Sequence, residues 1–299
     1  MKKYITYLFP IFTIILSSCE KYIEVELPPH VPKFIINAQL EPGIPVMVFV
    51  TQSRGILQDS NFSPVRDATV EIIEDGEKSY FLEFRGVEQT YWTVNGYVSD
   101  ELKIKAGKTY EVIVSGRMET ARSKVTVPNP VALKSVEIQQ GNDNMSEITI
   151  IFDDPQERNF YEFNVSFSAM RILEGWGGTI DTVYHTGDIG IEPLNPVYKK
   201  NYNTRGKVLL DDGLFNGREA RLQFSGNFNF LGNMEIKMIM RSVTEDYFKY
   251  YSTLNLQNQV SGDPLATPVQ VFSNIEGGRG IFIGAAKTEY VKKVSFTFD

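Results

Sequence analysis

Histidines and carboxylates are the side chains of this sequence that could support catalysis or hold a metal ion. The chain has two histidines, His30 and His185, and they lie far apart in the sequence. A zinc site needs several converging ligands, and a histidine-based triad needs a nucleophile and an orienting partner beside the imidazole. The sequence therefore predicts no catalytic residues, no resident metal and no cofactor.

Two acidic pairs, Asp153-Asp154 and Asp211-Asp212, are the remaining candidates for carboxylate chemistry. Adjacent residues on a strand point to opposite faces, whereas a glycosidase needs two carboxylates that face each other across a cleft. The pairs precede Pro155 and Gly213, where aspartates accept hydrogen bonds from turn amides. We therefore expect turn-capping roles. Calcium binding by the loop oxygens stays an open alternative.

The segment Gly277-Gly278-Arg279-Gly280 invites comparison with a phosphate-binding loop. Such a loop ends in Lys-Ser/Thr and leads into a helix, and neither feature follows here. Ile281 and Phe282 indicate a strand instead. We expect these glycines to serve positive φ angles or close backbone packing.

A glycine-rich stretch that runs from Gly175 to Arg205 is predicted to form a long irregular insertion. Its aromatic residues form a candidate surface for a ligand or partner, since exposed aromatic side chains dominate binding hot spots. The alternative is a loop that folds back and half buries its tryptophan. The candidate residues are Trp176, Tyr184, Tyr198 and Tyr202. Within the same stretch, Asp181-Thr182-Val183 resembles the O-glycosylation site of exported Bacteroidota proteins, so Thr182 is a candidate acceptor.

The amino terminus carries the clearest signal, because Lys2 and Lys3 precede an apolar run that ends at Leu16. This pattern is typical of a secretory signal peptide, and the run is shorter than the roughly 20 residues of a spanning helix. Leu16-Ser17-Ser18-Cys19 resembles the bacterial lipobox, which implies cleavage before Cys19 and acylation of that residue. We expect a signal peptide over residues 1–18, a lipidated tether over 19–32, and attachment to the membrane through lipid chains.

Composition excludes several classes of protein. The net charge is −7, and the predicted signal peptide holds two lysines and no acidic residue, so the processed chain is more acidic still. Nucleic-acid binding needs a basic face, so no nucleic-acid partner is expected. Cys19 is the single cysteine, which leaves no disulfide, and stability must come from packed cores.

Alternating apolar residues between turn signals predict an all-β fold in two parts. Residues 33–127 are expected to form an immunoglobulin-like or fibronectin-like sandwich. Tyr110 follows Gly107 at the start of an alternating strand, as in the tyrosine corner of such domains. Val127-Pro128-Asn129-Pro130 marks the expected boundary. Residues 131–299 are expected to form a larger sandwich-like β domain, with its last strand at 294–298.

One helix is expected in the second part, at about residues 244–260. Ser242-Val243-Thr244-Glu245 fits a capping box, and Gly262 and Pro264 end the helical pattern. Tyr247, Tyr250 and Leu254 fall on one helical face. We expect this aromatic face to pack on the sheet.

Several segments together resemble an uncharacterised family of Bacteroidota outer-membrane lipoproteins, a domain of unknown function. The matching segments are Cys19-Glu20-Lys21, Asp67-Ala68-Thr69-Val70, the helix from Tyr247 to Gln259, and Phe272-Ser273-Asn274-Ile275-Glu276-Gly277-Gly278 with Gly280-Ile281-Phe282. The last segment is the most specific. The resemblance implies an all-β lipoprotein, often encoded beside TonB-dependent receptors, with no catalytic residues to carry over.

We therefore expect a non-enzymatic lipoprotein, lipid-anchored to the outer membrane, that serves a TonB-dependent transporter as an accessory or ligand-capturing partner. Its ligand and the membrane face that it occupies, periplasmic or cell-surface, stay open. One alternative is a carbohydrate-binding or carbohydrate-active surface protein that uses Trp176 and an acidic pair. Another is an adhesin or structural surface protein.

Overall fold

The computed structural model describes residues 29–55, 63–88, 93–140, 145–174, 180–201, 206–227, 232–263 and 265–296. The chain divides into two units, residues 1–31 and residues 32–299, and the description below concerns the second unit. Its described part is built of strands with one α-helix, which confirms the all-β prediction. The first strands are β1 (Phe34–Leu40), β2 (Val46–Gln52), β3 (Thr69–Glu74), β4 (Lys78–Glu88), β5 (Thr93–Ser99), β6 (Thr109–Ser115) and β7 (Ala121–Thr126). They are followed by β8 (Leu133–Gln140), β9 (Met145–Asp153), β10 (Phe160–Glu174), β11 (Ile180–Ile189), β12 (Ile191–Pro193), the 3₁₀-helix η1 (Pro196–Asn201), β13 (Val208–Asp211), β14 (Glu219–Asn227), β15 (Gly232–Val243), α2 (Glu245–Val260) and β16 (Arg279–Phe296).

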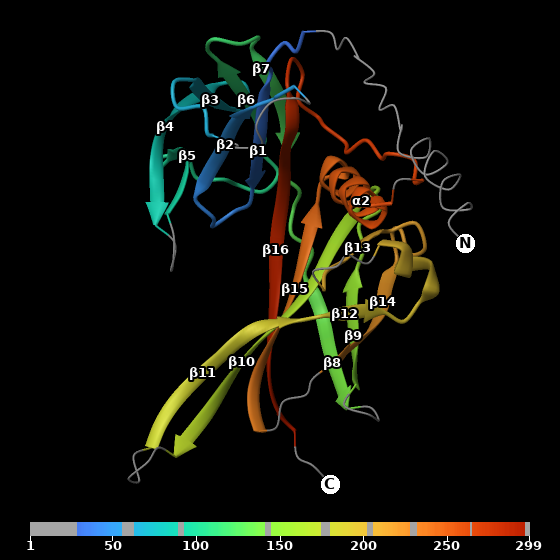
Figure 1. The fold of residues 1–299 in the computed structure, drawn as a ribbon. Helices are drawn as coiled ribbons and strands as arrows, with labels where there is room; N and C mark the ends of the chain where they lie inside the picture. Colours follow the sequence, from blue (N-terminus) through green and yellow to red (C-terminus); the bar gives the residue numbers. More distant parts are fainter. Residues whose placement is uncertain are drawn as a thin grey trace, which may run out of the picture. The chain divides into compact units, whose positions relative to one another are not determined.

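The first seven strands form a sandwich around one apolar core (Figure 1). They follow the order β1-β2-β5-β4-β3-β6-β7, and every neighbouring pair among them is antiparallel. This order corresponds to the ABED and CFG sheets of an immunoglobulin-type sandwich. Buried and partly exposed residues alternate along β1 and β6, as period-two strands with one face on a core require.

Tyr110 forms the predicted tyrosine corner at the start of β6. Its ring is fully buried, and its hydroxyl accepts a hydrogen bond of 2.9 Å from the backbone N–H of Lys105, five residues upstream. Burial raises the pKa of Tyr110 to about 12. The residue therefore fixes the approach to β6, and its role is structural.

The C-terminal strand β16 joins both parts of this unit. Its first residues pair in parallel with β1, from Ile35↔Arg279 to Leu40↔Gly284, and the remainder pairs antiparallel with β15. The prediction of a last strand at 294–298 was therefore wrong: the strand begins at Arg279 and passes the glycines without a break. Ile275 and Phe282 belong to the first core, so residues 33–127 share that core with C-terminal residues. The domain boundary predicted at residues 128–130 stays a prediction.

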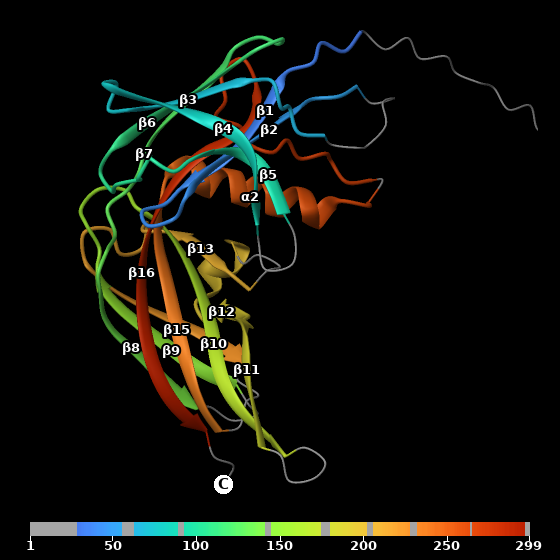
Figure 2. The ribbon, with the colours of Figure 1, turned by 90° about the vertical axis from the view of Figure 1, so that its left-hand side faces the viewer.

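The second part is a sandwich of two sheets around a separate core. Figure 2 shows β16, β15, β10 and β11 side by side, and the four-stranded sheet has the order β12-β14-β9-β8. Phe163 and Met240 from the first sheet and Phe152 and Phe224 from the second are all buried in this core. The architecture is thus sandwich-like in both parts, as predicted.

The expected irregular insertion between Gly175 and Arg205 is instead largely regular. Strands β10 and β11 form a long hairpin, with pairs from Val165↔Ile189 to Glu174↔Ile180 (Figure 1). The polar and β-branched residues of β11 suit a strand, because β-propensity depends on fit to a pleated surface rather than on apolar content. The glycines that suggested a loop, Gly175, Gly177 and Gly178, lie outside the described residues.

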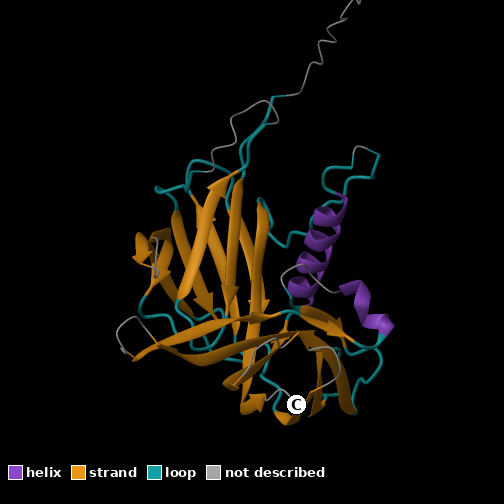
Figure 3. Ribbon diagram, turned by 60° about the horizontal axis from the view of Figure 1, so that its bottom comes forward, coloured by secondary structure: helices purple, strands orange, loops and turns teal. Residues whose placement is uncertain are grey.

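Helix α2, the longer of the purple helices in Figure 3, packs on the face of β10, β15 and β16 that points away from the second core. Its N-cap is Thr244, whose Oγ1 accepts a hydrogen bond from the N–H of Tyr247. The predicted capping box, in which Ser242 would be the N-cap, was wrong, because β15 continues through Ser242 to Val243. The expected packing is confirmed, since Tyr247 is buried against Phe160 and Ile283 of the sheet.

Candidate functional site

Most of the residues that the sequence singles out cannot be placed as side chains. Cys19, Trp176 and Tyr202 lie outside the described residues. Thr182 and Tyr184 lie on β11, opposite Ile172 and Met170 of β10, and the description of β11 there covers the backbone. The predicted glycosylation of Thr182 and lipidation of Cys19 stay predictions. Tyr198 is the one candidate aromatic with a described side chain.

Tyr198 is held on the short helix η1. The Asn195 side chain accepts a hydrogen bond from the N–H of Val197, and the Asn195 carbonyl accepts one from the N–H of Tyr198. These two bonds turn the chain inward, and the Tyr198 ring enters the core of the second sandwich. Burial raises the pKa of Tyr198 to about 12. Tyr198 is therefore a buried side chain and not the exposed contact that the sequence suggested.

Tyr198 borders a pocket of about 360 Å³ at the edge of the four-stranded sheet. Phe215, Leu222 and Phe224 supply an apolar side, and the Leu214 side chain is half exposed at the rim. The full lining is Pro193, Asn195, Tyr198, Leu214, Phe215, Arg218, Glu219, Arg221, Leu222, Gln223 and Phe224. Six of the eleven lining residues are polar or charged, so the pocket is more polar than most ligand sites and would suit a ligand with both apolar and hydrogen-bonding groups.

The acidic side chain at this pocket has a close ion-pair partner, whereas the two arginines do not. The Glu219 carboxylate lies 2.7 Å from Lys134 Nζ, whereas Arg221 is 3.9 Å from its nearest carboxylate partner, Glu137. Arg218 donates to the Leu214 carbonyl at 2.7 Å and forms no ion pair with any described residue. Arg218 and Arg221 are therefore the side chains at this pocket that could pair with a negatively charged group.

Little in the sequence predicts this pocket. Strand β14 begins at Glu219, and its first residues include the charged side chains Glu219 and Arg221 of this pocket. The buried positions of β14 alternate with exposed ones from Ala220 onward. This alternation is the feature of the sequence that could have predicted the full length of β14. The charged residues Arg218 and Arg221 make the apolar pattern harder to recognise.

The first acidic pair caps a turn, as predicted. Asp154 is buried and accepts hydrogen bonds from the Tyr161 hydroxyl at 2.5 Å and from the N–H of Gly217 at 2.9 Å. Burial raises the pKa of Asp154. Asp153 lies 2.6 Å from Lys134 on the exposed side, so the two carboxylates face apart.

The second acidic pair has the same arrangement. Asp212 is buried and accepts a hydrogen bond of 2.6 Å from the N–H of Asn159, while Asp211 accepts one from the N–H of Gly213. Among the described residues, no group of three or more histidine, cysteine or acidic side chains is placed to hold a metal ion. Asp154, Asp211 and Asp212 thus accept hydrogen bonds from backbone amides, whereas Asp153 pairs with Lys134.

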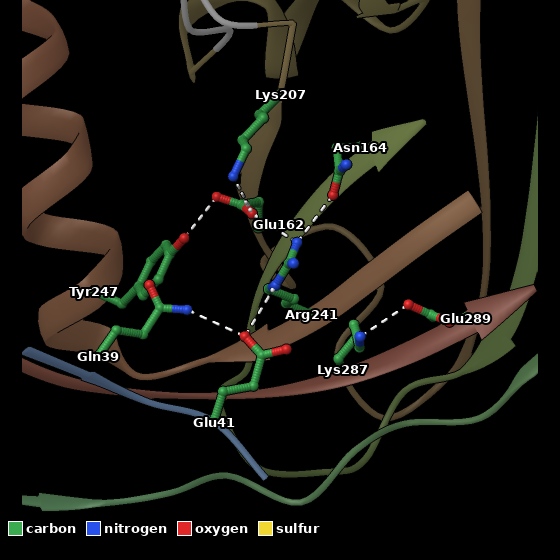
Figure 4. A network of polar contacts seen from close by, with 9 residues as sticks. All are labelled: Gln39, Glu41, Glu162, Asn164, Lys207, Arg241, Tyr247, Lys287 and Glu289. Atoms are coloured by element: carbon green, nitrogen blue, oxygen red, sulfur yellow. Dashed lines mark hydrogen bonds and ion pairs between the residues drawn. The ribbon is translucent and has the colours of Figure 1, made fainter. Parts of the chain in front are cut away.

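A buried polar network, which the sequence analysis missed, lies beneath α2 (Figure 4). The Arg241 guanidinium donates to Glu41 through Nε and to Glu162 through Nη1, at 3.2 Å in each case. Glu162 also accepts from the Tyr247 hydroxyl at 2.6 Å and from Lys207 Nζ at 3.1 Å. Burial raises the pKa of Tyr247 well above its ordinary value, and the neighbouring Glu162 adds to the effect.

This network is a joint between the two sandwiches rather than an acid–base pair. Glu41 directly follows β1, whereas Arg241 and Glu162 belong to β15 and β10 of the second part. Burial acts to lower the pKa of Arg241, and the charges of Glu41 and Glu162 outweigh it and leave the pKa raised. A glycosidase pair would face across open space, but here an arginine separates the carboxylates.

A second, polar groove of about 330 Å³ lies on the outer face of the large sheet. Its lining comes from β10, β11 and β15 and consists of Ser166, Phe167, Ser168, Thr186, Gly187, Asp188, Glu235 and Lys237. Hydroxyl and charged groups dominate this list, so the groove suits a polar ligand with many hydrogen-bonding groups.

A family model described as Domain of unknown function (DUF4249) matches residues 20–291, which is most of the chain. The chain belongs to this family. A search of curated proteins finds no match. The DUF4249 match contains the whole pocket beside Tyr198 and the whole Arg241 network.

In this DUF4249 chain, the segment that carried the most specific resemblance closes the fold. The Asn274 side chain accepts from the N–H of Phe282 and donates to its carbonyl, at 2.9 and 2.8 Å. Gly277 and Gly280 have φ angles of +71° and +103°. A Cβ on Gly280 would lie 2.0 Å from the carbonyl oxygen of Ile36. The glycines therefore serve backbone conformation and close packing, as predicted. Among the described residues, no helix is both long and apolar enough to span a bilayer.

Proposed function

We propose that this DUF4249 chain is a non-enzymatic, lipid-anchored protein of the outer membrane that captures a ligand for a TonB-dependent transporter. The observation that carries the ligand-capturing part is the pocket beside Tyr198, which combines an apolar side with Arg218 and Arg221. The lipobox-like sequence at Cys19 and the family resemblance support the anchor and the partner.

The absence of an enzymatic role in this proposal rests on how the titratable groups are used. The buried aspartates Asp154 and Asp212 bond to turn backbone, and Glu162 is tied to Arg241 and Tyr247. Each of these carboxylates therefore has a structural task. Binding without chemistry is the simplest use of the pocket.

The anchor is tested by Cys19→Ala, with Ser18→Ala as the matched control that keeps the acylated residue. Two or more acyl chains hold a protein stably on a bilayer, whereas the tether alone has no such affinity. We expect Cys19→Ala to leave the membrane fraction and Ser18→Ala to stay there. Equal membrane retention of both variants, measured by fractionation and immunoblotting, would contradict anchoring through a lipid on Cys19.

The partner is tested by affinity purification of the full-length protein from detergent-solubilised outer membrane. We expect a TonB-dependent transporter in the eluate, identified by mass spectrometry, and its absence from an eluate of a co-expressed unrelated lipoprotein. Recovery of the chain without any transporter, after mild crosslinking of whole cells, would contradict the proposed partnership. Protease treatment of intact cells would then separate a surface location from a periplasmic one.

A carbohydrate-binding role is the second candidate, and the polar groove on β10, β11 and β15 favours it. Ser166, Thr186 and Asp188 offer hydroxyl and carboxylate groups of the kind that bind sugars. The full-length chain would then bind oligosaccharides on a glycan array, and Asp188→Ala would weaken that binding. Glycan binding that is unaffected by Asp188→Ala would remove the groove from consideration.

A further inference from the structure

Strand β14 is much longer than the edge strand beside it. The pairs of β12 with β14 run from Ile191↔Gly226 to Pro193↔Phe224, and the N–H of Leu194 extends the ladder by donating to the Gln223 carbonyl at 2.9 Å. The chain then turns into η1. Within the described residues, β14 is bonded to β12 and β9, so no strand covers its outer edge at residues 219–222.

The exposed edge of β14 presents backbone groups in a regular row. The Gln223 carbonyl faces β12, and backbone groups alternate in direction along a strand. Arg221 and Glu219 therefore direct their N–H and C=O groups to the same outer side. The residue before Glu219 supports this assignment. The Arg218 carbonyl accepts a hydrogen bond from the N–H of Asp154 on the β9 side, so the backbone groups of Glu219, the next residue, point to the outer side.

The pocket of about 360 Å³ lies along this exposed edge. Its lining includes every residue of β14 from Glu219 to Phe224 except Ala220, together with Asn195 at the point where the line of β12 ends. Four residue steps along a strand span about 13 Å, at about 3.3 Å per residue. The pocket thus has the length of a peptide of about four residues in extended conformation.

We infer that this pocket binds a short peptide in extended conformation, which adds to β14 as an antiparallel strand in line with β12. Main-chain hydrogen bonds to Arg221 and Glu219 would hold the peptide, as in other cases of strand addition. Alternate side chains would face Phe215 and Tyr198 on the apolar side. This inference rests on the proposed ligand capture and names the class of ligand.

Charge favours a peptide with a free carboxyl terminus, because Glu219 at this end of the pocket is already paired with Lys134, whereas Arg218 forms no ion pair with a described residue. A strand that continues the direction of β12 ends beside Arg218, since β12 runs antiparallel to β14. The Arg218 guanidinium has five donors, and it uses one of them on the Leu214 carbonyl, its one hydrogen bond to a described residue. A terminal carboxylate there would gain a charge-assisted bond. The reverse orientation would bring a terminal ammonium against the same cation.

The test uses three tetrapeptides with free carboxylates, Ser-Val-Thr-Val, Ser-Leu-Thr-Leu and Ser-Phe-Thr-Phe, titrated by calorimetry into the full-length protein in detergent. The critical variant is Arg221→Pro, and Arg221→Ala is its control. Proline removes the outward N–H and leaves the β9 ladder intact, while alanine removes the side chain alone. We expect Arg221→Pro to bind at least tenfold more weakly than Arg221→Ala. Arg218→Ala should weaken the free acid and leave the peptide amide unchanged.

Backbone methylation of the peptide provides a test that does not depend on how the variant folds. N-methylation at successive positions should weaken binding with a period of two, because alternate N–H groups face β14. Binding that is insensitive to both proline and methylation would overturn strand addition. No binding by any of the three tetrapeptides at millimolar concentration would overturn the peptide assignment. Either failure leaves transporter co-purification, which tests the proposed function, as a separate result.

Discussion

Arg241 offers the sharpest test of how the two sandwiches are joined. Its side chain is 17% exposed and lies between the carboxylates of Glu41 and Glu162, which are 6% and 3% exposed. Replacing Arg241 with methionine keeps an unbranched apolar stem and removes the cation. Two buried carboxylates then lose their shared partner.

The expected loss of stability is about 3 kcal/mol. Removing one partner of a buried ion pair typically costs about 3 to 5 kcal/mol, because a buried charge is left without compensation. The lower figure applies here, since Lys207 still bonds to Glu162 and Gln39 still donates to Glu41. With a urea slope of about 2 to 3 kcal/mol per M, the unfolding midpoint should fall by about 1 to 1.5 M.

Urea unfolding followed by circular dichroism measures this shift. The matched comparison is a triple variant that adds Glu41→Gln and Glu162→Gln to Arg241→Met. We expect the triple variant to recover most of the lost stability, because neutral amides carry no uncompensated charge. A loss below about 1 kcal/mol for Arg241→Met, or a triple variant as unstable as the single one, would refute the assignment of a charge-balanced joint.

Two further predictions concern the backbone at β16 and the buried tyrosines. Gly280→Ala should lower the free energy of unfolding by more than about 3 kcal/mol, because its Cβ would overlap the carbonyl of Ile36, whereas Gly262→Ala, also at positive φ but in open space, should cost about 1 kcal/mol in the same urea assay. Equal losses would contradict the close-packing explanation. The pKa of Tyr110 is raised from 10.0 to about 12, so its contribution is fully present below pH 10 and is lost as the pH rises through about 12. Unfolding free energy measured against pH should fall over this range and fall less in Tyr110→Phe; an unchanged slope would contradict the role of this tyrosine.

Local patterns in the sequence determined a large part of the fold. Alternation of apolar residues predicted the strands of the first sandwich, and Tyr110 after Gly107 predicted the tyrosine corner. The helical spacing of tyrosines predicted α2 to within one residue at its start. These features depend on neighbours a few residues away, so a single sequence contains the physical information that they require.

Contacts between distant segments were decided by the tertiary structure. Arg241 contacts Glu41, which lies 200 positions away in the sequence, and β16 pairs with both β1 and β15. The pocket is present because β12 pairs with only part of β14 and leaves the remainder of its edge uncovered. No local sequence pattern predicts this difference in strand length. Side-chain periodicity tells which face of a strand is buried, but not which strand lies beside it. That choice is made by the packing of complete sheets around their shared cores.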